Sequence, residues 1–198
     1  MSEAKTLLQL AGADLAPAGL RTASLVLIDM QNEYVAGPIA VQGATAAIAN
    51  AARLLNSARA VGTPIFHVAH KGRPGGLFDR TAERGQFAAA LSPRAGELVI
   101  EKGLPNAFAG TELQARLDEV GRKDLIVVGF MTHMCVSSTA RAALDLGFRV
   151  TIDATSCGTR DLPDGRGGII HAETIHQVAL VELADRFAIV ARDQKDLI

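Results

Sequence analysis

Six short apolar runs that alternate with helical patterns constrain the fold of this chain more than any other feature. Most of the runs are continuous rather than alternating, as expected for strands that are buried on both faces of a sheet. Strands and helices that alternate in this way form right-handed βαβ crossovers and a parallel sheet. The runs are residues 24–29, 64–69, 97–102, 124–130, 149–154 and 187–192.

Helical patterns fill the intervals between these runs. Three of the patterns are followed by a glycine, which is a common residue at the end of a helix. We therefore predict a three-layer, Rossmann-like α/β fold, in which helices flank a six-stranded, mostly parallel sheet. The helices are expected over residues 43–61, 111–120, from Val136 up to Gly147, and 172–185.

The length of 198 residues predicts a single domain over residues 1–198, in which residues 1–21 form an N-terminal arm. The net charge is −1 and neither sign of charge forms a long block, which argues against a nucleic-acid partner or an anionic membrane. No apolar run approaches the roughly 18 residues that span a bilayer. The first residues do not resemble a signal peptide, and two cysteines are too few for a disulfide scaffold. We therefore expect a cytoplasmic protein.

Three chemically active side chains are expected at one edge of the sheet. Open parallel sheets bind ligands at the carboxyl ends of their strands. Asp29 ends the first predicted strand, Lys102 ends the third, and Cys135 follows the fourth at the predicted start of a helix. The topology therefore brings a carboxylate, an ammonium and a thiol to the same edge, although they are far apart in sequence.

These three groups suit nucleophilic catalysis. A thiol is a poor nucleophile until it loses its proton, and both a helix N-terminus and a neighbouring cation favour the thiolate. Asp29 can accept the proton of the Cys135 thiol and later return it to a leaving group. Lys102 can hold Asp29 in its ionised form, and backbone N–H groups before Cys135 can receive a developing oxyanion.

Each of the three residues also has a purely structural interpretation. Cys135 could be a small core residue, Asp29 could cap a turn, and Lys102 could be a solvated strand end. Cys157 follows the fifth predicted strand at the same edge, so it is a rival nucleophile, although no predicted helix starts there. The shared edge of Asp29, Lys102 and Cys135 favours the catalytic interpretation.

Three sequence motifs resemble those of the isochorismatase-like cysteine hydrolases. The segment LVLIDMQNEYV resembles their first-strand motif D-x-Q-x-D-F, and EKGLPNAFAGTELQARL resembles their lysine motif. The segment VVGFMTHMCVSSTARAALDLGFRVTIDAT resembles their nucleophile motif, G-x-x-T-x-x-C-V, with the helix and strand that follow it. The order and spacing of the motifs agree, and the resemblance covers roughly residues 22–192.

The resemblance implies a catalytic triad of Asp29, Lys102 and Cys135. It also implies a non-proline cis peptide bond between Phe130 and Met131. That bond would aim the N–H groups of Met131 and Cys135 into an oxyanion hole.

The substrate pocket is expected to have apolar walls. Tyr34, Phe108 and Phe130 are the residues assigned to these walls. The chain departs mildly from the family pattern, because Glu33 and Tyr34 replace the usual Asp-Phe pair and Asn106 replaces a serine. These changes leave the triad intact.

A metal site is not expected. Nicotinamidases of this superfamily carry an aspartate and histidines after the second strand, where this chain reads FHVAHKGRPGGLFD. His67 and His70 are three residues apart, which places them on opposite faces of a strand. This spacing argues against both a metal cofactor and nicotinamide as the substrate. Whether His67, His70 or His133 touches the ligand stays open.

The sequence therefore predicts a metal-free cysteine hydrolase that cleaves a small amide or related C–N bond through a thioester on Cys135. One alternative is isochorismatase-type hydrolysis of a vinyl ether, and Cys135 argues against it because that reaction does not use a cysteine nucleophile. The other is a non-catalytic oligomeric binding protein, which would not need an intact triad. The expected partner is a small-molecule substrate, and the resemblance suggests a homo-oligomer, a dimer or larger, without a cofactor.

Overall fold

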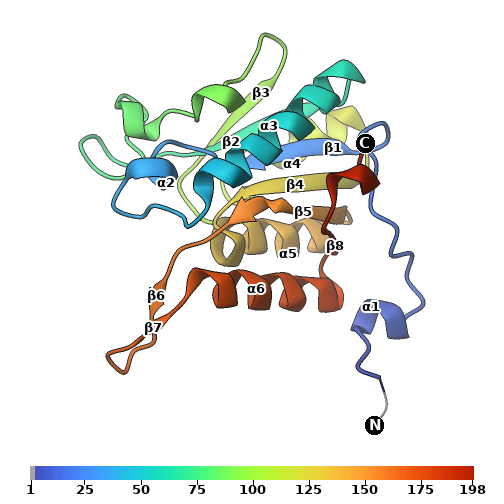
Figure 1. Cartoon of the computed structure of the whole chain (residues 1–198). Helices are drawn as coiled ribbons and strands as arrows, with labels where there is room; N and C mark the ends of the chain where they lie inside the picture. The colour runs from blue at the N-terminus through green and yellow to red at the C-terminus, as the bar shows by residue number, and fades with distance from the viewer. Residues whose placement is uncertain (1–2) are drawn as a thin grey trace.

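A computed structural model describes residues 3–198 and shows an α/β fold in three layers (Figure 1). Six strands form one sheet in the order β3-β2-β1-β4-β5-β8, and each neighbouring pair is parallel. The predicted fold class is therefore confirmed. The strands are β1 (Ser24–Ile28), β2 (Ile65–His70), β3 (Leu98–Lys102), β4 (Asp124–Phe130), β5 (Arg149–Gly158) and β8 (Ile189–Ala191).

Helices cover both faces of this sheet. Leu25 and Leu27 of β1 pack under α3, whereas Val26 and Ile28 pack against the helices on the other face. All five residues of β1 are buried, which explains why the run is continuously apolar. Within residues 3–198, no helix is both long and apolar enough to cross a bilayer. The helices are α3 (Ala44–Ala60) on one face, and α4 (Leu113–Val120), α5 (Ser137–Asp145) and α6 (Ala172–Arg186) on the other.

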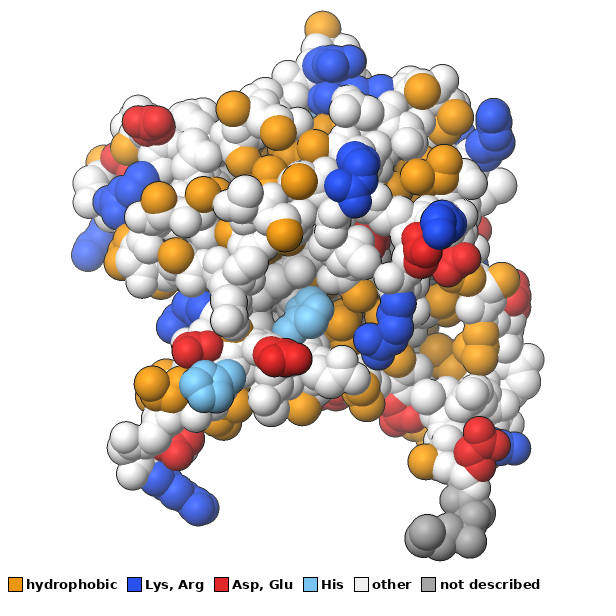
Figure 2. All heavy atoms as spheres, in the orientation of Figure 1, with side chains coloured by type: hydrophobic (Ala, Val, Ile, Leu, Met, Phe, Trp, Pro, Cys, Tyr) orange, Lys and Arg blue, Asp and Glu red, His pale blue; other side chains and the backbone are white. Residues whose placement is uncertain are grey.

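Several short elements were not predicted from the sequence, because an element of two to five residues shows no periodicity. The segment 70–96, expected to be a loop with a short helix in it, contains two single 3₁₀ turns instead. Figure 2 shows the β6–β7 hairpin and the N-terminal arm as two separate projections from the main body. The first two residues of the predicted arm lie outside the described residues. The short elements are α1 (Leu7–Leu10), α2 (Glu33–Ala36), β6 (Leu162–Pro163), β7 (Ile169–Ile170), a π-helical turn (Thr132–Val136) and 3₁₀ turns at Glu83–Gly85, Ala89–Leu91 and Gln194–Asp196.

Strand β5 continues four residues beyond its predicted end and shapes the carboxyl edge. Its pairing with β4 shifts register between Val127 and Gly129, which places Gly158 opposite Phe130. Gly129 has a φ of 130°, and a Cβ there would lie 2.0 Å from the carbonyl oxygen of Ile28. Only glycine allows this close approach of β1 and β4, just before both strands end.

Candidate active site

The three side chains predicted to act together form one buried cluster at the carboxyl edge of the sheet. Nζ of Lys102, the last residue of β3, lies 2.7 Å from Oδ2 of Asp29 and 3.4 Å from Sγ of Cys135. Asp29 directly follows β1, and Cys135 lies in the π-helical turn between β4 and α5. None of the three residues is more than 3% exposed. The structure therefore brings the predicted triad together.

A fourth group, the imidazole of His70, joins the cluster from the end of β2. Its Nδ1 lies 3.2 Å from Nζ of Lys102. Gln31 fixes this strand end, because its side chain accepts a hydrogen bond from the His70 N–H at 2.8 Å and donates one to the His70 carbonyl at 3.0 Å. The sequence left the role of His70 open, although its place at the end of the second predicted strand was a signal for the same edge.

The histidine is neutral near pH 7. Burial, and then the charge of Lys102, lowers the pKa of His70 to about 4. Nδ1 of a neutral His70 can accept a hydrogen bond from the Lys102 ammonium, which fixes where that ammonium lies.

Burial outweighs the nearby positive charge at the cysteine. The pKa of the Cys135 thiol is raised to about 12, chiefly by burial and then by the charge of Asp29, while Lys102 opposes the rise. Lys102 thus favours the thiolate, as expected from the sequence, but burial has the larger effect on this pKa. Burial also raises the pKa of Asp29 against the opposing effect of Lys102. Cys135 rests as a thiol, and Asp29 is a stronger base than an exposed aspartate.

One oxygen of the Asp29 carboxylate is free to accept a proton. Oδ1 is buried and has no hydrogen-bond partner among the described residues, whereas Oδ2 is held by Lys102. Asp29 has a left-handed backbone with a φ of 51°, a conformation that aspartate tolerates better than most residues. Ligand atoms of Asp29, His70 and Cys135 lie within 4.8 Å of one another, so the thiol is close to this carboxylate.

A carboxylate, an imidazole and a thiol are also groups that bind metal ions. In this cluster Nζ of Lys102 makes a hydrogen bond with each of the three, so its ammonium takes the place of a bound cation. His67 lies apart from the cluster, because its Nε2 is 2.8 Å from Oε2 of Glu97. His67 and His70 therefore do not form a ligand pair, as their spacing predicts.

The peptide bond between Phe130 and Met131 is cis, as the resemblance implies. It directly precedes the turn that carries Cys135. The assignment of the Met131 and Cys135 N–H groups to an oxyanion hole stays a prediction.

The end of β5 holds this turn in place. The hydroxyl of Thr132 donates to the Gly158 carbonyl at 3.0 Å and lies 2.8 Å from Nδ1 of His176. Nδ1 of His133 lies 2.6 Å from the hydroxyl oxygen of Thr159. These contacts were not predicted, because β5 was expected to end four residues earlier.

Aromatic rings surround the site, and two of them were predicted. The ring centroid of Tyr34 lies 5.6 Å from that of Phe130 and 5.2 Å from that of Phe78. Phe78 also packs on His70, with centroids 4.8 Å apart. The structure therefore places Tyr34 and Phe130 near the triad. Phe78 was missed, because it comes from the irregular segment 70–96.

Glu33 holds Phe78 over the site. Its buried carboxylate accepts hydrogen bonds from the Phe78 N–H at 3.1 Å and from Arg84 at 3.2 Å. Phe78 has a left-handed backbone with a φ of 57°, which is uncommon for a bulky residue. The replacement of the family's usual aspartate by Glu33 thus has a structural role in this chain.

Phe108 lies in a different cluster. Its ring stacks on Phe148 at a centroid distance of 6.0 Å, and Phe148 directly precedes β5 at the opposite, amino edge of the sheet. The prediction that Phe108 lines the pocket is not supported by this placement, because its ring packs on a residue at the other edge of the sheet.

Cys157 is buried at the end of β5, opposite Gly129 in the sheet. Burial, and then the charge of Asp153, raises the pKa of its thiol. Within residues 3–198, no hydrogen bond joins its side chain to the triad. The rival nucleophile therefore lacks the contact with Lys102 that Cys135 has.

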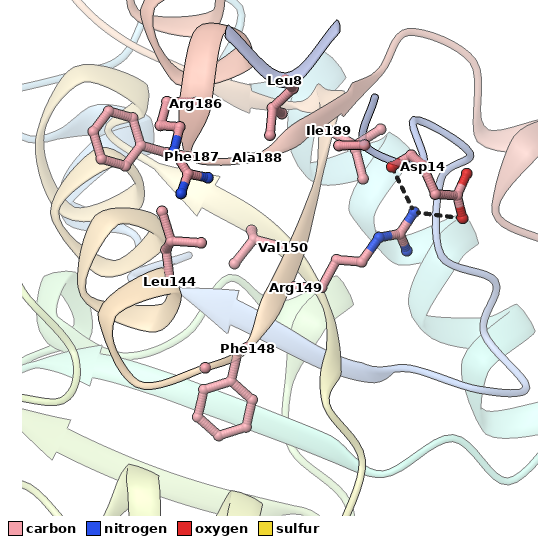
Figure 3. Close-up of a pocket in the computed structure, with 12 residues that line it drawn as sticks. Leu8, Asp14, Leu144, Phe148, Arg149, Val150, Arg186, Phe187, Ala188 and Ile189 are labelled. Atoms are coloured by element: carbon pink, nitrogen blue, oxygen red, sulfur yellow. Dashed lines mark hydrogen bonds and ion pairs between the residues drawn. The ribbon is translucent and has the colours of Figure 1, made fainter. Parts of the chain in front are cut away.

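A mostly apolar cavity of 350 Å³ lies at the amino edge of the sheet, away from the triad (Figure 3). It lies between the N-terminal arm and the starts of β5 and β8. Leu8 of the arm and Leu144, Val150 and Ile189 of the body line it, and Arg149 reaches Asp14 at its rim. The residues that line it do not include Asp29, Lys102 or Cys135.

Comparison with known proteins gives a consistent result. Residues 23–195 match the model of the isochorismatase domain. The crystal structure of an isochorismatase from Pseudomonas putida KT2440 has a TM-score of 0.95 and 47% identity, covering 99% of this chain and 100% of that one. The secreted isochorismatase effector Isc1 of Verticillium dahliae is 36% identical over 89% of this chain and 90% of its own length. Maleamate amidohydrolase of Pseudomonas putida is 30% identical over 71% of this chain and 74% of its own length.

Proposed function

This chain belongs to the isochorismatase domain family of hydrolases, and from that premise we propose that it cleaves a small amide or related C–N bond with Cys135 as the nucleophile. The observation that carries the proposal is the contact of one buried ammonium, Lys102, with both the carboxylate of Asp29 and the thiol of Cys135. The similarity to an amidohydrolase supports C–N bond cleavage.

The first half-reaction forms a thioester. Sγ of Cys135 attacks the acyl carbon while the thiol proton moves to Oδ1 of Asp29. Because the pKa of this thiol is about 12, the proton leaves as the new C–S bond forms rather than beforehand. The N–H groups of Met131 and Cys135 bind the oxyanion. Asp29 then returns the proton to the nitrogen, the C–N bond breaks, and ammonia or an amine departs.

The second half-reaction releases the acid. Asp29 takes a proton from water as the water oxygen attacks the thioester carbon. When the tetrahedral intermediate collapses, the C–S bond breaks and the sulfur of Cys135 recovers the proton from Asp29. Lys102 compensates the charge that moves between carboxylate and sulfur, so the cycle needs no metal ion. Neutral His70 orients the Lys102 ammonium.

Tyr34 and Phe130 form the apolar walls beside the acyl group in this proposal, and Phe78 covers it. These rings pack on one another and the triad is buried, which favours a small substrate. The proposal also includes a homo-oligomer, because Ile169, Val178 and Val181 are more than half exposed. Sedimentation velocity of the purified chain tests it: a dimer or larger species is expected, and a monomer at all concentrations would contradict it.

The enzymatic test is a panel of small amides, ureido acids and isochorismate, followed by intact-mass analysis. A slow substrate should leave an acyl group on the wild-type chain, and the Cys135→Ala variant should show neither turnover nor adduct. Vinyl-ether hydrolysis predicts another pattern, in which Asp29→Asn is inactive, Cys135→Ala is largely active, and no adduct forms. That pattern would replace the present proposal, and it has some support because two similar proteins are called isochorismatases.

A further inference from the structure

One hydroxyl group makes two short contacts inside the π-helical turn Thr132–Val136, the nucleophile turn. Oγ1 of Thr132 lies 3.0 Å from the carbonyl oxygen of Gly158, the last residue of β5, and 2.8 Å from Nδ1 of His176 in α6. Thr132 is fully buried, and His176 is half-buried. The reaction proposed for this site uses neither side chain, so the arrangement has another cause.

The number of protons gives the direction of these two hydrogen bonds. A hydroxyl group has one proton to donate, and a carbonyl oxygen has none. When Thr132 donates to the Gly158 carbonyl, its second contact is a hydrogen bond only if Nδ1 of His176 carries a proton. Burial, and then the charge of Arg192, lowers the pKa of His176, so its imidazole is neutral near pH 7. The single proton of this imidazole is therefore on Nδ1.

Helix α6 is held at both ends, so it gives His176 a fixed position. Leu180 and Leu183 of this helix pack in the same apolar cluster as Cys135. Near its first residue, the carboxylate of Asp161 accepts a hydrogen bond from the first N–H of the helix at 2.7 Å. Figure 1 shows α6 beside α5 on one side of the sheet. His176 therefore connects a well-packed helix to the nucleophile turn.

The position of Thr132 affects the nucleophile because both residues lie in the same short turn. Cys135 follows Thr132 by three residues, and the turn joins β4 to α5. Sγ of Cys135 lies 3.4 Å from Nζ of Lys102, so a small shift of the turn removes this contact. A misplacement of about 1 Å at a reacting atom typically costs on the order of 10² in rate.

We propose that His176 is a positioning residue for the nucleophile. Its Nδ1–H donates to the Thr132 hydroxyl, which donates to the Gly158 carbonyl, and this directed chain of hydrogen bonds keeps the sulfur of Cys135 beside Lys102. Helix α6 and the end of β5 thus hold the nucleophile turn between them. The inference rests on the proposed hydrolase function, because it assigns a role in placing the attacking sulfur.

Matched pairs of variants test the chain on an amide that the wild-type chain hydrolyses. Leucine and asparagine are similar in size, but only asparagine keeps an N–H donor at the position of Nδ1. His176→Leu should lower kcat about 10–100-fold with KM little changed, and His176→Asn should restore most of the loss. Thr132→Val and Thr132→Ser should differ in the same way. Thr132→Val added to His176→Leu should lower kcat little further, because both changes break one chain. Gln177→Leu, at an exposed neighbouring position of α6, is the control.

The tautomer of His176 is measured by ¹⁵N NMR of the imidazole in the wild-type chain, which needs neither a variant nor a substrate. Nδ1 should carry the proton near pH 7, and Nε2 should carry none. A proton on Nε2 alone would mean that the imidazole accepts from Thr132, and would overturn the proposal. An Nδ1 proton together with an unchanged kcat in His176→Leu would also overturn it, because the hydrogen bond would then have no effect on the nucleophile.

Alkylation of Cys135 by iodoacetamide in a Cys157→Ala background separates this inference from the hydrolase proposal. A loosened turn relieves the burial that raises the thiol pKa, so His176→Leu should react at least about threefold faster than the background chain at pH 8. His176→Asn should react at the rate of the background chain. If no amide is hydrolysed but these rates differ as expected, the hydrolase proposal fails and the role of His176 stands. If no amide is hydrolysed and the rates are equal, both fail. If amides are hydrolysed and kcat of His176→Leu is unchanged, the role of His176 fails and the hydrolase proposal stands.

Discussion

Two buried cysteines lie at the ends of neighbouring strands of this sheet, and each has a buried aspartate near it. Cys135 follows β4 and has Asp29 and Lys102 beside it. Cys157 ends β5, and the charge of Asp153 acts on it. Burial raises the pKa of both thiols. The two regions therefore resemble each other in the direction of the thiol pKa shift. They differ in the groups that bind the carboxylates of Asp29 and Asp153.

Both carboxylate oxygens of Asp153 accept hydrogen bonds from neutral donors. One of its oxygens accepts from the N–H and the hydroxyl of Thr155 at 2.9 and 2.7 Å, and the other accepts from the Ser156 hydroxyl and from the Gln194 amide at 2.7 Å. Asp29 instead has one ammonium on Oδ2 and an open Oδ1. A carboxylate whose acceptors are all used ties chain segments together, whereas one with a free acceptor can take a proton.

The largest expected contrast between the two regions is in turnover. Cys135→Ala should lower kcat/KM on the amide substrate by on the order of 10⁴-fold or more, because the nucleophile and its base act as one unit. Adding Asp29→Asn should lower it little further. Cys157→Ala should leave kcat/KM within about threefold, because no reacting atom touches it. Steady-state kinetics of the three variants checks this, and a comparable loss in Cys157→Ala would reverse the assignment of the nucleophile.

A second contrast concerns stability. Lys102→Met leaves the Asp29 carboxylate buried without its cation, so the free energy of unfolding should fall by about 3–5 kcal/mol at pH 7 in urea denaturation. Gln194→Met removes one neutral donor from Asp153 and should cost less, about 1–3 kcal/mol.

Two further variants separate the charge effect from lost packing. Asp29→Asn added to Lys102→Met should recover much of the loss, because no uncompensated charge then remains. Lys71→Met removes an exposed lysine paired with Glu101 and should cost less than about 1 kcal/mol. Failure of the double variant to recover stability would mean that packing of the lysine stem, rather than its charge, stabilises the region.

The third contrast is in thiol reactivity, measured with iodoacetamide in a Cys157→Ala background. The wild-type Cys135 should react slowly at pH 8 and faster as the pH rises towards its pKa of about 12, because only the thiolate reacts. Asp29→Asn removes a negative charge that raises this pKa, so the variant should react faster at pH 8, roughly tenfold for a fall of about one pKa unit. The same variant should be almost inactive as a hydrolase. An unchanged alkylation rate would show that Asp29 does not set the thiol pKa.

The smallest expected effect concerns Phe78, which packs on His70 beside Cys135. Glu33→Gln weakens the bonds that hold Phe78 and Arg84, and should raise KM about three- to tenfold with kcat nearly unchanged. Glu83→Gln, a change at an exposed neighbouring position, is the control. A fall in kcat as large as that of the triad variants would place Glu33 in the catalytic machinery instead.

The sequence predicted the positions of Asp29, Lys102 and Cys135 better than their surroundings. That these side chains lie together follows from strand ends, because parallel strands place their carboxyl ends at one edge. The same reasoning does not predict where the rings of Phe78 and Phe108 lie. Each lies in an irregular segment, and the direction of its ring depends on contacts with residues far away in the chain.

The sequence by itself determined the parallel sheet, the helix layers and the edge where the reactive groups gather, because continuous apolar runs must be buried on both faces and short crossovers leave few topologies. Only the tertiary structure decided that Cys135 rests as a thiol and that Asp29, but not Asp153, keeps a free acceptor. These properties depend on burial and on interatomic distances of a few ångströms. Packing sets both, and no local sequence pattern encodes them.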